Sequence, residues 1–188
     1  GYDVVTQPRE ASRSLGYIPD EPYLYEKLTG REFLEFVSEM YGLPHALAQE
    51  RIAREIASFE LADFVDHLTE SYSHGMTQRL VFASSMLHDP EVLVIDEPMV
   101  GLDPRSVRLV KDLLRRKADE GVTIFMSTHT LEVAEEIADR FGIFDHGKLL
   151  FLGTVPELRT ALEVHEGSLE RLFLELTSAD DEPARHDR

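Results

Sequence analysis

Residues 92–98, Val-Leu-Val-Ile-Asp-Glu-Pro, decide the fold of this chain of 188 residues. The four consecutive β-favouring apolar residues predict a strand buried on both faces, as the strands of parallel sheets are. Pro98 has no backbone N–H to give to a neighbouring strand, so we expect the strand to end before it. The segment therefore predicts an α/β fold with a mostly parallel sheet. It also places two carboxylates at the carboxyl end of a strand, where open sheets of this class bind ligands.

Asp96 and Glu97 are neighbouring acids whose charges repel each other, and burial would disfavour the ionised form of both unless a cation lay close by. A magnesium nucleotide supplies such a cation. Asp96 can hold Mg²⁺ directly or through water, while Glu97 can orient an attacking water. The alternative is a strand that ends in an acidic turn without function.

The start of a helix lies upstream of this strand. Residues 80–87 indicate a largely buried helix, and Ser73 is a natural N-cap for it. A helix N-terminus presents free N–H groups and the positive end of its dipole, and both favour phosphate. Gly75 would let the backbone approach an anion closely. Ser73 and Gly75 are therefore candidate phosphate contacts, although Ser73 alone is also explained as a cap.

A second apolar segment, residues 122–126, predicts a strand that ends in Ser-Thr-His. His129 then lies at the same kind of strand end as Glu97, where an imidazole can hydrogen-bond a terminal phosphate or a water. Asp103 precedes Pro104, which is the usual start of a helix. The carboxylate of Asp103 is therefore either a helix cap or a nucleotide contact.

The order of these motifs resembles that of the ATP-binding subunit of an ABC transporter. The signature segment falls on residues 72–76, Walker B on 92–96 and the D-loop on 101–103. Residues 168–177 resemble the closing helix of subunits that drive ABC-2 type exporters. The resemblance implies a P-loop NTPase-like sheet with a helical insert, binding of ATP and Mg²⁺, and ATP hydrolysis that powers a membrane exporter.

The resemblance also implies roles for single residues. They are catalysis by Glu97 and His129, metal binding by Asp96, and nucleotide contacts at Asp20, Ser73, Gly75 and Asp103. Asp20 stands in the Q-loop position, where the family usually has Gln. In the family, ATP lies between the phosphate loop of one subunit and the signature helix of another. A second copy of the chain, in a homodimer, is therefore an expected partner, with Ser73 and Gly75 acting in trans.

Three signature positions depart from the family pattern. Tyr72 stands where Leu is usual, His74 replaces a glycine, and Met76 stands where Gln is common. A histidine beside the phosphate contact either adds a donor or crowds the site. His74 therefore supports an alternative function, a catalytically silent ABC-fold interaction module, although intact acids at 96 and 97 speak against it.

The chain is strongly acidic, with 36 Asp and Glu against 19 Lys and Arg and a formal net charge of −17. Such a charge opposes binding along a polyphosphate backbone, so we expect no nucleic-acid partner. No run approaches the roughly 18 apolar residues of a membrane span. With the resemblance, this predicts a cytoplasmic subunit, peripheral at the inner face of the cell membrane, whose partner is the transmembrane subunit of the transporter.

No Gly-x-x-x-x-Gly-Lys-Ser/Thr loop occurs in the sequence. In nucleotide-binding proteins this loop wraps backbone N–H groups round the phosphates and supplies a lysine. We expect an N-terminal truncation that removes this Walker A loop, and we favour it over a degenerate paralogue. We therefore expect the chain alone to bind ATP weakly or not at all.

The same patterns predict the organisation of the chain. We expect a partial α/β ATPase core at residues 1–28 and 91–177, a helical signature subdomain at 29–90, and a disordered tail at 178–188. Within these parts, the local signals are a capping box at Thr29-x-x-Glu32, a helix starting with Pro44, a short helical piece at 61–65, helices at 104–120 and 131–141, and a hairpin turning at His146-Gly147.

Overall fold

The computed structural model describes residues 1–164 and 167–180. The chain forms two compact units, Gly1–Ser127 and a second unit that begins at Thr128. In the described residues, no helix combines the length and the apolar content that crossing a membrane requires.

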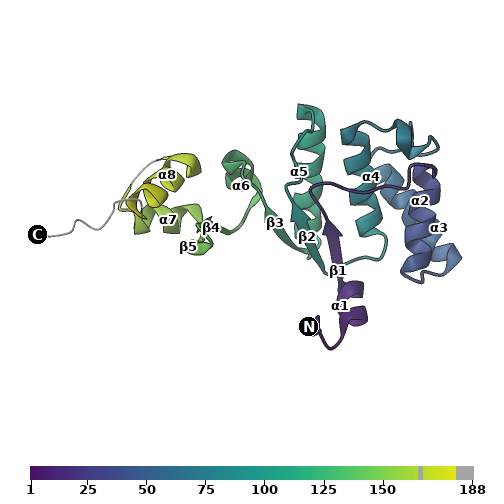
Figure 1. Ribbon diagram of the computed structural model, residues 1–188, viewed down its shortest axis with the longest axis horizontal. Helices are drawn as coiled ribbons and strands as arrows, with labels where there is room; N and C mark the ends of the chain where they lie inside the picture. The colour runs from purple at the N-terminus through teal and green to yellow at the C-terminus, as the bar shows by residue number, and fades with distance from the viewer. Residues whose placement is uncertain (165–166, 181–188) are drawn as a thin grey trace, which may run out of the picture. The chain divides into compact units, whose positions relative to one another are not determined.

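The first unit contains a three-stranded parallel sheet of β1 (Leu15–Ile18), β2 (Val92–Asp96) and β3 (Thr123–Ser127) in the order β1-β2-β3 (Figure 1). The central strand aligns Val92 with Leu15 on one side and Thr123 on the other. All three carboxyl ends therefore meet at one edge of the sheet. The predicted parallel α/β core is confirmed.

Only one face of this sheet is well covered. Leu93 and Ile95 of β2 are buried, whereas Val92 and Val94 on the opposite face are half-buried. On that opposite face, Tyr17 is 55% exposed and Phe125 is 67% exposed. The prediction of a strand buried on both faces is thus wrong, because the covering helices pack against one side.

Helix α4 (His74–Met86) lies on the covered face. A Cβ atom at Gly16 of β1 would come within 3.0 Å of the carbonyl of Ser85, so helix and strand touch where glycine leaves room. Residues 80–86 of α4 are nearly all buried, which confirms the predicted buried helix. This packing fixes the position of α4 along the strands.

The segment between β1 and β2 is mostly helical, with α2 (Gly30–Met40), α3 (His45–Ser58) and a short 3₁₀ turn, η1 (Thr69–Ser71), before α4. The capping box that opens α2 is present: the Thr29 hydroxyl accepts from the Glu32 N–H at 3.2 Å, and the Glu32 carboxylate accepts from the Thr29 N–H at 2.8 Å. Pro44 is the N-cap of α3. The helical piece predicted at 61–65 is absent, because the chain there forms turns. Helix α1 (Pro8–Ser14) was not predicted.

Helix α5 (Pro104–Asp119) follows β2 and is capped by Glu120, after which Gly121 has a φ of 98° that suits only glycine. The second unit consists of α6 (Leu131–Ile137), the antiparallel hairpin of β4 (Phe141–Asp145) and β5 (Lys148–Gly153), α7 (Val155–Ala161) and α8 (Leu169–Asp180).

The hairpin of the second unit turns at His146 and Gly147 as predicted, with φ values of 45° and 76°. Its core gathers Ile143, Leu158 and Leu172. Helix α6 ends earlier than predicted. Helix α8 ends at Asp180, and residues 181–188 of the predicted tail lie outside the described part.

His88, which follows α4, contacts the start of β1 and the end of α2. Its Nε2 donates to the Leu15 carbonyl at 3.1 Å, and its ring stacks on Tyr41 with centroids 3.9 Å apart. Burial lowers the pKa of His88, and nearby Arg51 acts in the same direction, while the hydrogen bond to Leu15 and the charge of Asp89 oppose it. Its Nδ1 is buried and has no hydrogen-bond partner among the described residues. The folded unit therefore prefers the neutral imidazole.

This preference predicts that acid destabilises the first unit. The unfolded chain takes up a proton near the ordinary histidine pKa of 6.5, whereas the folded chain resists it. The free energy of unfolding is then retained above this value and falls as the pH drops from about 6.5 towards the lowered pKa. Urea unfolding followed by circular dichroism at about pH 7.5 and about pH 5.5 measures this loss. His88→Gln should lose less than the parent chain, and the exposed control His45→Gln should match the parent. Equal losses in all three proteins would contradict the prediction.

Candidate functional site

Asp96 is the last residue of β2 and pairs in register with Ser127 at the end of β3. The Ser127 hydroxyl donates a hydrogen bond to the Asp96 carboxylate. The Asp96 side chain faces solvent at the carboxyl edge of the sheet. A neighbouring strand therefore orients a charged oxygen ligand without burying it.

Glu97 makes the turn out of β2. Its N–H donates to the Ser127 carbonyl at 3.2 Å, which extends the ladder by one bond. Its φ of 43° lies in the left-handed region, an uncommon conformation for glutamate that costs free energy. The turn continues when the Val100 N–H donates to the Glu97 carbonyl at 3.3 Å. A strained acid at the carboxyl edge of a parallel sheet is typical of a functional residue.

Helix α4 begins as the sequence predicted. The Ser73 hydroxyl accepts from the Met76 N–H at 3.3 Å, and the Met76 sulfur accepts from the Ser73 N–H at 3.5 Å. The first acceptor of the helix is the Ser73 carbonyl, which takes the Thr77 N–H at 2.9 Å. The N–H groups at His74 and Gly75 therefore have no acceptor within the helix.

Gly75 is not required by the packing of the chain itself. A Cβ atom there would meet the Ser106 hydroxyl at 3.5 Å, Leu102 at 3.8 Å and the Asp103 carboxylate at 3.9 Å, which are ordinary contacts. Alanine is also a better helix former than glycine. Neither the packing of the chain nor helix propensity therefore explains the glycine at position 75.

Asp103 caps helix α5. One carboxylate oxygen accepts from the N–H groups of Arg105 and Ser106 at 2.9 and 3.1 Å, and the other accepts from the Ser106 hydroxyl at 2.6 Å. The hydroxyl and N–H of Ser106 lower the pKa of Asp103. The structure therefore shows the cap, while a nucleotide contact by Asp103 stays a prediction.

The loop between β2 and α5 touches the start of α4 through a residue that sequence reasoning left outside the site. The His74 ring donates a hydrogen bond to the Val100 carbonyl and lies over Gly101. The only signal for it in the sequence was the replacement of the family's glycine. Nearby, the Tyr72 hydroxyl donates to the Phe64 carbonyl at 2.8 Å, and burial raises the pKa of Tyr72 to about 12. Tyr72 is thus a packing residue.

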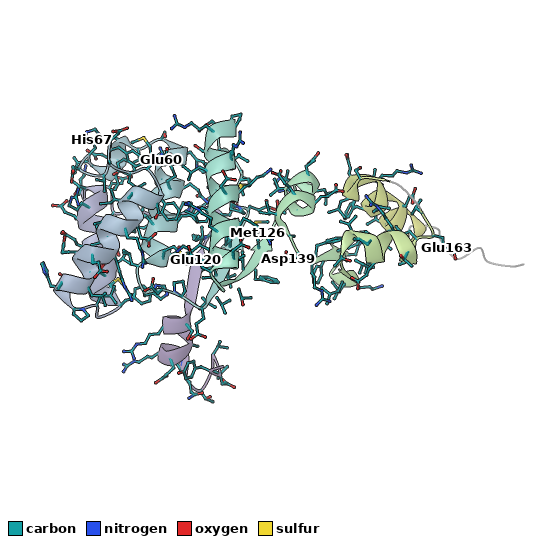
Figure 2. The ribbon with its side chains drawn as sticks, turned by 180° about the vertical axis from the view of Figure 1, so that it is seen from behind. Glu60, His67, Glu120, Met126, Asp139 and Glu163 are labelled. Atoms are coloured by element: carbon teal, nitrogen blue, oxygen red, sulfur yellow. The ribbon has the colours of Figure 1, made fainter. Side chains whose placement is uncertain are left out.

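The start of α5 is also linked to the helical segment. Arg105 contacts the Glu60 carboxylate at 3.2 Å, and Arg79 donates to the Glu60 carbonyl at 3.2 Å (Glu60 is labelled in Figure 2). The Arg105–Glu60 pair is solvent-exposed on both sides, so it adds little to stability.

The other two predicted site residues lie at strand ends as well. Asp20 is exposed and follows β1 at the same edge of the sheet as Asp96. His129 is exposed and follows β3, as the second residue of the second unit. The structure thus gathers Asp96 and Glu97 at one edge, and it brings the start of α4 against the start of α5.

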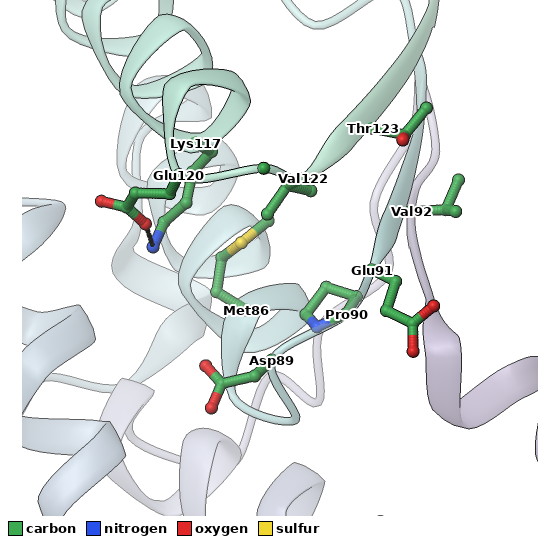
Figure 3. Close-up of a pocket in the computed structure, with 10 residues that line it drawn as sticks. Met86, Asp89, Pro90, Glu91, Val92, Lys117, Glu120, Val122 and Thr123 are labelled. Atoms are coloured by element: carbon green, nitrogen blue, oxygen red, sulfur yellow. Dashed lines mark hydrogen bonds and ion pairs between the residues drawn. The ribbon is translucent and has the colours of Figure 1, made fainter.

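A pocket of about 490 Å³ lies at the opposite edge, among the first residues of β2 and β3 and the last residues of α4 and α5 (Figure 3). Lys117 in its wall pairs with Glu120 at 2.8 Å. Because ligands of parallel sheets bind at the carboxyl ends of the strands, this pocket is not the candidate site. The described residues contain no cluster of three His, Asp or Glu side chains that could hold a metal. A Mg²⁺ ion at Asp96 would take its other ligands from water and phosphate oxygens, as is usual for this ion.

Comparison with known proteins agrees with this fold. The sequence profile described as ABC transporter matches residues 2–100, and a profile described as an AAA domain matches residues 69–135. A solved structure titled "Structure of ATP binding subunit of ABC transporter" aligns with a TM-score of 0.86 at 32% identity, covering 94% of this chain and 74% of that one.

Curated relatives match the chain at similar levels of sequence identity. The daunorubicin/doxorubicin resistance ATP-binding protein DrrA of Streptomyces peucetius is 38% identical over 86% of this chain and 49% of its own length. The linearmycin resistance ATP-binding protein LnrL of Bacillus subtilis is 33% identical over 86% of this chain and 52% of its own length. The chain thus spans about half the length of these two curated relatives. It spans 71% of the ABC transporter ATP-binding protein YthP of Bacillus subtilis, at 34% identity. On the matching profile, the shared fold and these identities, the chain belongs to the ABC transporter family of ATP-binding proteins.

Proposed function

We propose that this chain is the ATP-binding and ATP-hydrolysing part of an ABC exporter. The observation that carries the proposal is the acidic pair at the carboxyl edge of the parallel sheet. Asp96 is oriented there by Ser127, and Glu97 is held in a left-handed turn. The family membership and the resistance functions in the names of two relatives support the exporter assignment.

The residues of the site fit a magnesium nucleotide. Asp96 would hold Mg²⁺, and the uncapped N–H groups at the start of α4, beside Ser73 and Gly75, would take phosphate oxygens. Bound MgATP supplies the phosphoryl group that is transferred to water. Glu97 orients that water and accepts its proton, while His129 contributes a ring nitrogen as a hydrogen-bond donor. Asp20 is a water-mediated contact in this proposal.

A second copy of the chain completes the site in this proposal. In the family arrangement, the signature helix contacts the nucleotide held by the other subunit. Gly75 supports such a role, because its own chain leaves room for a methyl group where glycine stands. We therefore propose a homodimer in which Ser73 and Gly75 of one copy face the nucleotide of the other.

The membrane subunit is the other proposed partner, which would place the protein at the cytoplasmic face of the membrane. Helix α2 and the loop before it expose an apolar patch, in which Tyr23 is 80% exposed and Met40 is 72% exposed. Tyr25 lies at the centre of the patch, with its ring edge-on to Tyr23 at 5.9 Å and to Phe36 at 5.3 Å. Grouped apolar side chains on a surface mark protein–protein contacts, so we assign this patch to the membrane subunit.

The test is ATP hydrolysis by the protein that contains this chain together with a phosphate-binding loop. Because two copies complete each site, we expect the rate per mole to rise with protein concentration until the dimer saturates. Adding the membrane subunit should change this rate, and Tyr23→Ser combined with Met40→Ser should reduce that response while leaving the basal rate unchanged. Absence of hydrolysis at every concentration, with and without the membrane subunit, would contradict the function and favour a silent module.

A further inference from the structure

His74 makes two contacts with the loop that follows Glu97. Its Nε2 lies 2.9 Å from the carbonyl oxygen of Val100. A carbonyl only accepts, so Nε2 carries the hydrogen and Nδ1 is the nitrogen without one in the neutral ring. The ring also covers Gly101, where a Cβ atom would come within 3.0 Å of His74 Cδ2 and 3.2 Å of Nε2. A side chain at position 101 would therefore require the His74 ring to move by a few tenths of an ångström.

The loop that His74 contacts has its own internal bonds. The Val100 N–H donates to the Glu97 carbonyl at 3.3 Å, and the Leu102 N–H donates to the Met99 carbonyl at 3.4 Å. Both bonds are long, and Glu97 and Gly101 adopt left-handed backbone angles, with φ of 43° and 71°. The contact of His74 therefore adds an external hydrogen bond to a loop whose two internal bonds are long.

The contacts of His74 lie between two parts of the chain that the proposed function assigns to different nucleotides. His74 follows Ser73 at the first turn of α4, the part that would contact the nucleotide of a second copy. Val100 lies in the turn that starts at Glu97, the residue that acts on the nucleotide of its own copy. The imidazole therefore joins the first turn of α4 to the turn that starts at Glu97.

We propose that His74 is a positioning residue that clamps the turn carrying Glu97 to the first turn of α4. It thereby couples the two nucleotide sites in which one chain takes part. The proposal rests on the function assigned above, but the clamp itself exists without nucleotide. It gives the histidine a role that glycine, the usual family residue at this position, cannot perform.

Amide hydrogen exchange on the chain without nucleotide tests the clamp directly. His74→Ala removes both the donor and the ring, so we expect the amides of Val100 and Leu102 to exchange roughly three- to tenfold faster. Amides of α3 should keep their rates. His74→Gln retains a donor at a similar reach and should restore most of the protection. Arg105→Ala, which removes an exposed contact near the same loop, serves as the control with unchanged rates. Unchanged exchange in His74→Ala would overturn the proposal.

Gly101→Ala probes the same contact from the loop side. An added methyl group would press on the imidazole, at 3.0 Å from Cδ2, and would also strain a left-handed residue. Gly42→Ala carries the second cost without the first, because its φ is 69° and nothing lies within 4 Å of its Cβ position. We expect Gly101→Ala to destabilise more than Gly42→Ala, and the excess to disappear in the double variant with His74→Ala. Equal effects of the two glycine variants, or an excess that persists without the histidine, would overturn the contact.

Steady-state hydrolysis by the longer protein then separates positioning from ligand binding. A positioning role predicts that His74→Ala lowers kcat roughly tenfold with little change in KM for ATP, and that His74→Gln recovers most of the rate. A rise in KM with unchanged kcat would show a direct nucleotide contact and overturn the positioning role. If the parent protein hydrolyses no ATP, the proposed function fails, while the exchange experiment still decides the clamp.

Discussion

Replacing Glu97 with glutamine is expected to lower ATP hydrolysis roughly a hundredfold or more, which is the usual contribution of a general base. Glutamine has the shape of glutamate and can still hydrogen-bond a water, but its amide does not accept a proton at neutral pH. The turn at Glu97 is set by backbone bonds to Ser127 and Val100, so the substitution leaves its geometry in place. ATP affinity should therefore be retained while turnover is lost.

Phosphate release and ATP binding are measured together on the longer protein that contains the chain, with Glu91→Gln as the matched control. Glu91 is an exposed acid just before β2, at the opposite edge of the sheet, so its amide variant should keep the parental rate. A Glu97→Gln protein that hydrolyses ATP within about twofold of the parent would show that the carboxylate is not the base.

Replacing Asp96 with asparagine should have a comparably large effect, but on the metal. The amide keeps an oxygen that can accept from the Ser127 hydroxyl, so the strand pairing is preserved. It lacks the negative charge that Mg²⁺ requires of a carboxylate ligand. We expect the affinity for MgATP to fall by roughly a hundredfold, at the upper end of the losses seen when even indirect metal contacts are removed.

Titration of ATP with and without Mg²⁺ measures this effect. In a chelator the parent and Asp96→Asn proteins should bind ATP equally, because the metal is absent from both. Ser127→Ala, which removes the donor that orients Asp96, should show a smaller loss with Mg²⁺. Asp112→Asn, on an exposed part of α5, should show none. A Mg²⁺ dependence that survives in Asp96→Asn would place the metal on another residue.

Much of the fold followed from local chemistry. The apolar run that ends in two acids predicted the central parallel strand, and the pair Thr29 and Glu32 predicted the start of α2. Asp103 before a proline predicted the start of α5, and the His146-Gly147 turn predicted the hairpin. Each of these features depends on residues that are neighbours in sequence.

The errors have physical reasons as well. Helix α1 buries none of its residues, so it lacks the apolar periodicity by which a helix is recognised. Leu61, Phe64 and Val65 have helical spacing, yet the chain buries them by folding into turns. The spacing correctly indicated that these side chains face the same way, but tertiary packing determined that the backbone forms turns and not a helix.

The candidate site was likewise predictable where it depends on sequence neighbours and not where it depends on tertiary packing. Asp96 and Glu97 are adjacent, so their shared place at the sheet edge was evident from the sequence. The contact of His74 with Val100 depends on how α4 lies against a distant loop, which no local pattern encodes. Roles in catalysis for Glu97, His129 and the other site residues stay predictions.

The room beside Gly75 has a practical consequence for the interpretation of variants. Alanine there meets only ordinary neighbours and strengthens a helix, so expression level, melting temperature and solubility would all rank it as harmless or beneficial. Screens that use folding as a proxy for fitness would pass this substitution, although under the proposed function it would weaken the contact with the nucleotide of a second copy.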